Sequence, residues 1–248
     1  MKLQKIVSRL QELHPKEIDL SLDRIQNLCQ RLGNPQDKLK AISIVGTNGK
    51  YSTIQAMFAI LKEANIKCNI YTSPHIKSIN ERFVFNNQEL NDEELASLFE
   101  EIESANNNET ITFFEILTAA YFLKASQYQD NINLIETGLF HRFDATNILK
   151  TNLASIVTSI GLDHLDWLPE NEQTVEKIIY EKTSTLLKSK KTVAEGAHTV
   201  KAIHKLSKKL KIDLPINNEI YKILYLNKDI DKSISELLNR PLTTEKKL

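Results

Sequence analysis

The sequence predicts an α/β protein with a mostly parallel sheet flanked by helices, followed by a C-terminal helical tail. Three observations support this prediction. Short β-branched apolar runs alternate with longer runs of helical spacing, an order typical of βαβ units. A glycine-containing loop at residues 46–50 joins one buried run to the next helix. The last part of the chain has helical spacing throughout. We therefore expect two domains, an α/β domain at 1–187 and a basic helical segment at 188–248.

The individual elements follow from local patterns. Apolar residues at helical spacing predict a first helix that ends at His14-Pro15 and a second that ends at Gly33-Asn34-Pro35. Ala41–Val45 is short, apolar and β-branched, which indicates a buried strand. Asn91, with Glu94 at the capping-box position, predicts another helix start. The other predicted strands are 67–72, 83–85, 132–136 and 154–160, and the other predicted helices are 52–64, 113–127, 172–187, 199–210, 217–226 and 230–239.

The composition excludes several classes of protein. Of 248 residues, 41% are hydrophobic, and 32 basic against 32 acidic residues give a formal net charge of zero, without the basic field of a nucleic-acid binder. The charge is uneven, because residues 182–248 hold 15 basic and 7 acidic side chains. Two cysteines form neither a disulfide framework nor a zinc site, and no segment resembles a membrane span or a signal peptide. We expect a cytoplasmic protein without nucleic-acid or membrane partners.

The string Gly46-Thr47-Asn48-Gly49-Lys50-Tyr51-Ser52-Thr53 lies where a phosphate-binding loop belongs, after a buried strand and before a helix. Backbone N–H groups there can bind phosphate, and the helix N-terminus adds a favourable potential. Lys50 would supply positive charge for the β- and γ-phosphates, and Ser52 would bind Mg²⁺. The spacing differs from the standard G-x-x-x-x-G-K-[ST] loop. An ordinary glycine turn before a helix is the alternative.

Polar side chains also follow other predicted strands. Glu136 ends one strand, Ser73 follows another, and Asp163-His164 lies just beyond a third. Because ligands of parallel sheets bind beyond the carboxyl ends of the strands, we expect these groups near the loop, where they suit Mg²⁺ bridging ATP oxygens. The alternatives are an ion pair of Glu136 with Arg142, and a strand-end His164 that is hydrogen-bonded to backbone.

GTNGK at 46–50 is the first of seven short motifs that follow one another in the order of a known family. The others are TSPH at 72–75 with NERF at 80–83, TFFE at 112–115, ETGL at 136–139, DATN at 144–147, TSIGLDH at 158–164 and EK at 181–182. On these motifs, residues 10–187 resemble the folylpolyglutamate synthase/dihydrofolate synthase family of the Mur ligase superfamily.

The resemblance implies the Mur ligase central-domain fold and a ligase that uses ATP and Mg²⁺. It implies addition of glutamate to folate, to dihydropteroate or to both, through an acyl phosphate. Lys182 is similar to the family's carbamylated lysine, and its alternative is a solvated helix lysine paired with an acid. By resemblance, the catalytic residues are Lys50, Lys182 and His164, the nucleotide-binding residues are Gly46, Thr47, Asn48, Gly49, Lys50, Ser52 and Thr53, and the metal ligands are Ser52, Ser73, Glu136 and His164.

The chain departs from the family pattern at three places. Tyr51 stands where the family has glycine, so its ring would either crowd the γ-phosphate or point to solvent. Phe140-His141 replaces two glycines, so that loop must change shape or accept strain. Residues 194–242 do not resemble the family's C-terminal domain, which closes over ATP and helps to bind glutamate. A separate chain that supplies that domain is one expected partner, beside the small-molecule substrates.

The tail from 194 to 242 resembles instead the helical C-terminus of NAD-dependent glycerol-3-phosphate dehydrogenase. No GxGxxG motif accompanies it, so the dehydrogenase's nucleotide-binding domain is absent from this sequence. An oxidoreductase is therefore disfavoured. A non-catalytic remnant that binds nucleotide or folate remains the second interpretation beside the ligase.

Overall fold

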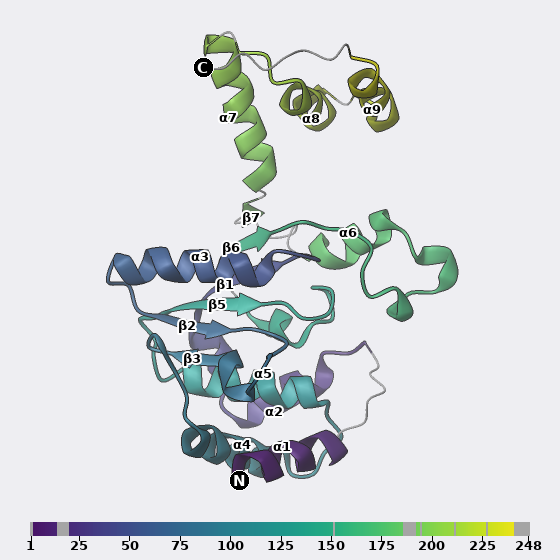
Figure 1. Cartoon of the computed structure of the whole chain (residues 1–248). Coiled ribbons are helices and arrows are strands. Elements are labelled where there is room, and N and C mark those ends of the chain that lie inside the picture. The colour runs from purple at the N-terminus through teal and green to yellow at the C-terminus, as the bar shows by residue number, and fades with distance from the viewer. Residues whose placement is uncertain are drawn as a thin grey trace. The chain divides into compact units, whose positions relative to one another are not determined.

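The structure is a computed structural model that describes residues 2–13, 20–150, 152–185, 192–193, 195–210, 212–226 and 228–240 (Figure 1). The chain divides into two compact units, Met1–Val193 and Ala194–Leu248. The domain boundary expected between residues 187 and 188 falls outside the described residues and stays a prediction. The predicted end of the first helix at His14-Pro15 lies outside them too.

Unit 1 is built on a mostly parallel sheet, as predicted. Its described strands are β1 (Lys40–Val45), β2 (Cys68–Tyr71), β3 (Phe83–Phe85), β4 (Gln88–Glu89), β5 (Ile132–Glu136), β6 (Asn152–Val157) and β7 (Thr192–Val193). They lie in the order β4-β3-β2-β5-β1-β6-β7. Only β3 and β4 run antiparallel to their neighbours. In register, Ile44 of β1 is opposite Glu136 of β5, and Val45 is opposite Val157 of β6, so three carboxyl ends reach one edge together.

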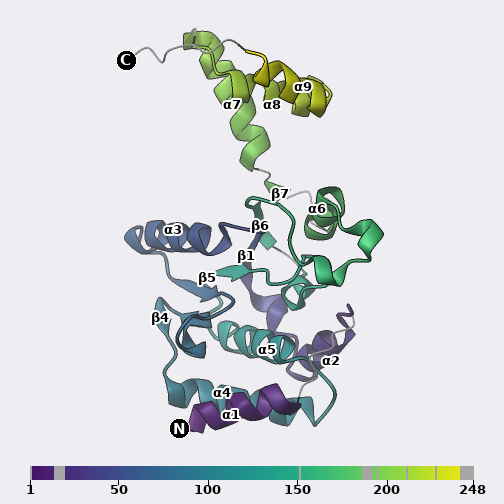
Figure 2. The ribbon, with the colours of Figure 1, turned by 45° about the vertical axis from the view of Figure 1, so that its right-hand side comes forward.

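Helices cover both faces of this sheet (Figure 2). The helix α3 (Lys50–Glu63) packs on one face, where Ile54 meets Ile44, Ile70 and Leu134. The helix α5 (Phe113–Ala125) packs on the other face, and α1 (Lys2–Leu13), α2 (Asp23–Arg31) and α4 (Asp92–Asn106) form a further layer outside α5. The larger core lies on the α5 side and is rich in aromatic rings, such as Tyr71 and Tyr121 with centroids 4.8 Å apart.

Local sequence signals account for most boundaries. Asn91 accepts hydrogen bonds from the first-turn amides of α4, and Glu94 completes the predicted capping box. Two short strands escaped prediction, namely β4 and β7. The hairpin between β3 and β4 turns at Asn86 and Asn87, both with positive φ, which suits a tight two-residue turn. The helix α6 (Val175–Thr183) begins later than predicted, because Glu170–Glu172 forms a 3-10 turn and Thr174 caps the helix.

Unit 2 contains the three predicted helices, α7 (Glu195–Leu210), α8 (Pro215–Leu226) and α9 (Ile230–Leu238). The His204 and Tyr221 rings stack with centroids 3.8 Å apart and join α7 to α8. Glu219 of α8 forms ion pairs with Lys222 and Lys228. Across the described residues of both units, no helix combines the length and apolar character needed to cross a membrane.

The loop that carries Phe140-His141 accepts strain rather than avoiding it. Phe140 has a φ of 40°, in the left-handed region where side chains other than glycine are disfavoured. Its buried ring packs with Leu168 and Ile178. The N–H groups of His141 and Arg142 both donate to the carbonyl of Glu181, at 3.1 Å each. Packing and these two hydrogen bonds therefore hold the strained conformation in place.

We expect Phe140→Ala to lower the free energy of unfolding by about 3 kcal/mol, because a buried ring is lost. Phe140→Gly loses the same ring but relieves the left-handed backbone, so it should be about 1 kcal/mol more stable than the alanine variant. Urea denaturation of both variants measures the difference. A glycine variant less stable than the alanine variant, as at ordinary positions, would contradict the strain at Phe140.

Candidate functional site

The loop after β1 requires glycine at two positions. A Cβ atom on Gly46 would lie 1.9 Å from Oγ1 of Thr158. Gly49 adopts a φ of 84° and is the N-cap of α3. The chain therefore turns directly from a buried strand into the N-terminus of a helix, which is the geometry of an anion-binding loop.

The segment that follows β6 fixes this loop from one side. Thr158 Oγ1 and Ser159 Oγ both donate to the carbonyl of Asn48, at 2.7 and 3.1 Å. The Thr47 and Asn48 amides donate to the Ser159 carbonyl, at 2.7 and 3.4 Å. This contact explains why β6 ends at Val157, three residues before the predicted end. The first-turn amides of α3, those of Lys50, Tyr51 and Ser52, have no intrahelical acceptor, as at the start of any helix. They are therefore the groups that can bind an anion.

Lys50 lies between the loop and the end of β5. Its Nζ donates to the Gly46 and Thr47 carbonyls, at 3.1 and 3.3 Å, and lies 3.8 Å from Oε1 of Glu136. The buried Glu136 carboxylate accepts a hydrogen bond from the Ser73 amide at 3.0 Å. Burial raises the pKa of Glu136, while the Ser73 amide and the Lys50 charge oppose that shift.

The alternative of an ion pair between Glu136 and Arg142 is wrong. The Arg142 guanidinium donates both Nε and Nη2 to the Glu181 carboxylate, at 2.8 and 2.9 Å. Glu136 therefore keeps its second oxygen directed toward Lys50 rather than toward a structural arginine.

Lys182 joins the same group from α6. Its Nζ donates to the Gly46 carbonyl at 3.2 Å and lies 3.4 Å from Oδ2 of Asp163. The alternative, a solvated helix lysine paired with an acid, is wrong about solvation, because the side chain is only 2% exposed, and is confirmed in the pairing with Asp163. Burial lowers the pKa of Lys182; the Asp163 charge opposes this, and the Lys50 charge adds to it.

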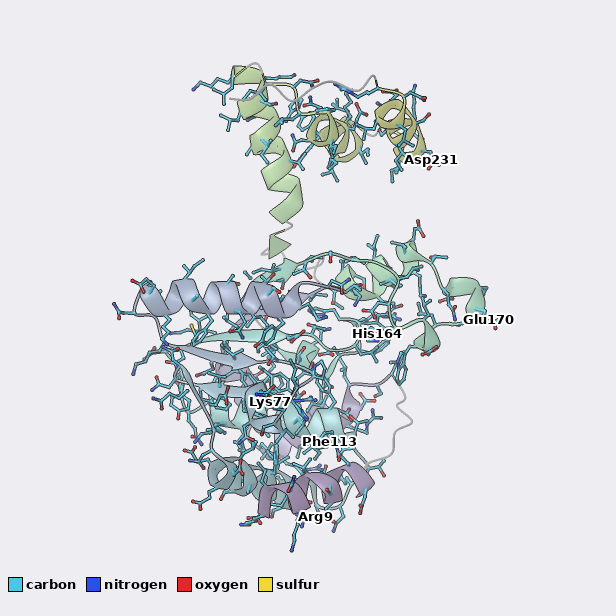
Figure 3. All side chains as sticks on the ribbon, viewed as in Figure 1. Arg9, Lys77, Phe113, His164, Glu170 and Asp231 are labelled. Atoms are coloured by element: carbon cyan, nitrogen blue, oxygen red, sulfur yellow. The ribbon has the colours of Figure 1, made fainter. Side chains whose placement is uncertain are left out.

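His164 stands on the other side of Asp163, with Nε2 3.4 Å from Oδ2. Its ring meets the Phe140 ring edge-on, with centroids 5.8 Å apart. Burial lowers the pKa of His164; the Asp163 charge opposes this shift, and the charges of Lys182 and Lys50 add to it. Figure 3 shows His164 on the side of unit 1 that faces away from Arg9.

The structure thus gathers Lys50, Ser73, Glu136, Lys182 and His164 at one edge of the sheet, through Asp163 and the loop carbonyls. Ser52 and Thr53 lie in the first turn of α3, and no hydrogen bond within the described residues joins Ser52 to the other predicted metal ligands. In the part of the chain that the structure describes, no group of three or more His, Cys, Asp or Glu side chains could hold a metal ion. The predicted ligands are two hydroxyls, one carboxylate and one imidazole. They include only two side chains of the His, Cys, Asp and Glu types, so they do not form such a group.

Tyr51 points to solvent, the second of its two expected orientations. Its side chain is 57% exposed. The residue lies in the first turn of the helix α3, a backbone conformation that tyrosine adopts without strain.

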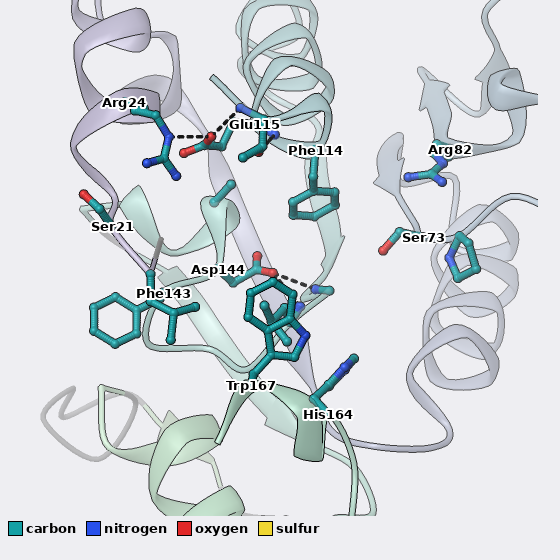
Figure 4. Close-up of a pocket in the computed structure, with 16 residues that line it drawn as sticks. Ser21, Arg24, Ser73, Arg82, Phe114, Glu115, Phe143, Asp144, His164 and Trp167 are labelled. Atoms are coloured by element: carbon teal, nitrogen blue, oxygen red, sulfur yellow. Dashed lines mark hydrogen bonds and ion pairs between the residues drawn. The ribbon is translucent and has the colours of Figure 1, made fainter. Parts of the chain in front are cut away.

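A cavity of about 320 Å³ adjoins this edge (Figure 4). Ser73 and His164 line it, so it shares two side chains with the predicted metal site. The rings of Phe114, Phe143 and Trp167 supply apolar wall. Its charged wall residues are Arg24, Arg82, Glu115 and Asp144.

Two carboxylates organise the cavity wall, a role that sequence reasoning did not assign. Glu115 accepts from Nε of Arg24 at 3.0 Å and from the Thr112 amide at 2.8 Å. Buried Asp144 accepts from the Gly138 and Leu139 amides, at 2.9 Å each. Burial raises the pKa of Asp144 to about 6. The TFFE and DATN motifs contain these carboxylates, and were the available signal.

His141 gives the site loop a pH dependence. The ring is buried, with Nδ1 3.0 Å from Oγ1 of Thr185, and burial lowers its pKa to about 4. Between pH 6.5 and 4 the unfolded chain binds a proton at this position more readily than the folded chain, so stability falls as the pH falls. We expect His141 to account for a loss of about 2 kcal/mol in the free energy of unfolding between pH 7 and pH 5.

His141→Gln should lose this part of the pH dependence, because glutamine does not titrate. Urea denaturation of wild type and variant at pH 7 and pH 5 measures it. An equal drop in stability in both proteins would contradict the assignment to His141.

Comparisons with known proteins give two separate matches. The curated dihydrofolate synthase/folylpolyglutamate synthase of Escherichia coli K12 is 38% identical over 169 residues, which is 68% of this chain and 40% of the relative. The enzyme of that description from Haemophilus influenzae is 37% identical over 71% of this chain and 39% of the relative. The chain therefore spans about 40% of the length of these curated relatives.

Solved structures agree. E. coli FolC in complex with DHPP and ADP has a TM-score of 0.66 at 38% identity, covering 73% of this chain and 42% of that chain. The bifunctional synthase of Yersinia pestis complexed with AMPPNP and a Mn ion has a TM-score of 0.66 at 34% identity, covering 73% and 43%.

Residues 169–235 match the family model described as the NAD-dependent glycerol-3-phosphate dehydrogenase C-terminus. This confirms the resemblance predicted for the tail, and the match begins earlier than the predicted residue 194. Over about 70% of its length, the chain is homologous to the folylpolyglutamate and dihydrofolate synthases of the Mur ligase family.

Proposed function

We propose that unit 1 is the ATP-binding part of a ligase that joins glutamate to a folate or dihydropteroate carboxylate. The observation that carries the proposal is the shared edge of the sheet. The anion-binding loop with Lys50 adjoins Glu136, and Ser73 and His164 belong both to this group and to the aromatic cavity. Phosphate donor and acceptor would therefore meet at one place. The relatives solved with DHPP and ADP, and with AMPPNP and Mn, support these ligand classes.

The residues at this edge fit a nucleotide and its metal ion. The buried Glu136 carboxylate faces the loop, and hydroxyl, carboxylate and imidazole groups suit Mg²⁺ together with phosphate oxygens. Ser73, Glu136 and His164, with Ser52, would hold the ion. When bound, Mg²⁺ would neutralise charge on the transferred phosphoryl group.

The chain's own residues would bind and orient the reactants. The first-turn amides of α3 and the Lys50 ammonium would hold the β- and γ-phosphates. A carboxylate oxygen of the acceptor attacks the γ-phosphorus, and the bond to ADP breaks. The amino group of glutamate then attacks the acyl carbon, loses a proton, and displaces phosphate. Positioning and charge neutralisation provide most of the rate enhancement in such transfers.

Lys182 is proposed to react with CO₂ to form a carbamate. The reaction requires the neutral amine, and burial lowers the pKa of Lys182 in that direction. The carbamate would be an anion next to the loop carbonyl of Gly46. Mass spectrometry of the chain kept under CO₂ would detect the carbamate on Lys182 directly.

The second candidate is a non-catalytic remnant that binds nucleotide or folate. Two observations favour it: Phe140 is strained, and residues 169–235 match a different family. A glutamate-dependent ADP-release assay with pteroate and folate acceptors separates the two candidates. Glutamate-dependent turnover by this chain supports the ligase. ATP binding without glutamate-dependent turnover supports the remnant.

We expect Lys50→Ala to weaken binding of Mg·ATP by at least about tenfold, because a charge-assisted contact to phosphate is lost. Lys62→Ala, at the opposite end of α3, is the matched control and should bind as wild type does. Isothermal titration calorimetry measures both. If Lys50→Ala binds Mg·ATP as tightly as wild type, or if wild type gives no binding heat, the proposed nucleotide site is contradicted.

A further inference from the structure

Within the described part of the chain, one arginine lacks the carboxylate partner that the others have. The sequence contains six arginines. Five of them, Arg9, Arg24, Arg31, Arg142 and Arg240, form ion pairs with carboxylates. Among the described residues, Arg82 has no carboxylate within ion-pair distance, and its one side-chain hydrogen bond runs from Nε to Nδ1 of His75 at 2.9 Å.

Arg82 is not a surface arginine that water could satisfy completely. Its side chain is half-buried, and burial lowers the pKa of the guanidinium, while the charges of Tyr71 and Glu136 oppose that shift. A cation partly removed from water without a carboxylate in direct contact costs free energy, so such a group indicates an anionic ligand. The neighbouring Arg24, which lines the same cavity, has its charge balanced by Glu115.

The position of Arg82 indicates which anion it meets. It ends the short helix Ile79–Arg82 and lines the aromatic cavity on the Ser73 side, as Figure 4 shows. The Ser73 amide binds Glu136, so this wall adjoins the phosphate loop. Lys50 does not line the cavity, whereas Arg82 does. If a ligand fills the cavity, the end of that ligand closest to the phosphate loop would therefore contact Arg82.

The chemistry of the side chain favours a carboxylate. With Nε bound to His75, the two terminal nitrogens remain to donate in one plane, which matches the two oxygens of a carboxylate. We infer that Arg82 binds the carboxylate of the acceptor and directs it toward the phosphate loop. Arg82 thereby selects ligands that carry an aromatic body and a terminal carboxylate. This inference rests on the proposed function, because it assumes that the cavity holds the acceptor.

The test compares pteroate with its neutral methyl ester, each titrated calorimetrically into the full chain. Wild type should bind pteroate at least about tenfold more tightly than the ester. Arg82→Gln should lose about tenfold in affinity for pteroate and less than about twofold for the ester. Arg82→Lys, which keeps the charge without the planar fork, should fall between. Lys77→Gln removes a cation from the same loop outside this cavity and is the matched control.

Several outcomes overturn the inference. Equal losses for pteroate and ester in Arg82→Gln, with an unchanged melting temperature, would assign Arg82 a packing role. A loss of Mg·ATP affinity in Arg82→Gln as large as that in Lys50→Ala would assign it to phosphate. If wild type binds neither pteroate nor the ester while binding Mg·ATP, the acceptor cavity fails, and the inference fails with it. If Lys77→Gln still prefers pteroate to the ester as wild type does, the effect of Arg82→Gln comes from a local contact. If it loses that preference, the effect is a general one of charge.

Discussion

The site depends on the register of three parallel strands. Because Ile44 pairs with Glu136 and Val45 with Val157, β1, β5 and β6 deliver their following residues to one edge. Hydrogen bonds from Thr158 and Ser159 then fix the loop after β1, so the loop is held by its neighbour strand as well as by its own glycines. A shift of one residue in this register would separate Lys50 from Glu136 and turn side chains to the opposite face.

The charged side chains at this edge contact the loop and one another in two short series. Lys50 lies between the loop carbonyls and Glu136, and Lys182 lies between Gly46 and Asp163, which in turn meets His164. Burial shifts the pKa of Glu136 upward and those of Lys182 and His164 downward, in each case toward the neutral form. Burial removes the water that would stabilise the charged forms of these side chains. A phosphate anion and a divalent cation bound at this edge would stabilise those charged forms instead.

Much of unit 1 could be predicted from sequence, because its strands are short apolar runs and its helix starts carry local caps such as Asn91 with Glu94. The family resemblance, which rested on seven motifs in order, was confirmed by the comparisons with known proteins. The end of β6 could not be predicted, since it depends on a contact between Thr158 and Asn48 far apart in the chain. The aromatic cavity and the unpaired Arg82 escaped for the same reason: both arise from tertiary neighbours. The roles of the individual site residues stay predictions.

The central claim is that the loop, Glu136 and His164 surround a single nucleotide-and-metal site. The most direct measurement is a crystal structure of the full chain with Mn·AMPPNP, in which anomalous scattering locates the ion. The account predicts a Mn peak within coordination distance of Glu136 and His164, with the phosphates on the first-turn amides of α3. A nucleotide bound elsewhere, or an ion that neither side chain contacts, would contradict it.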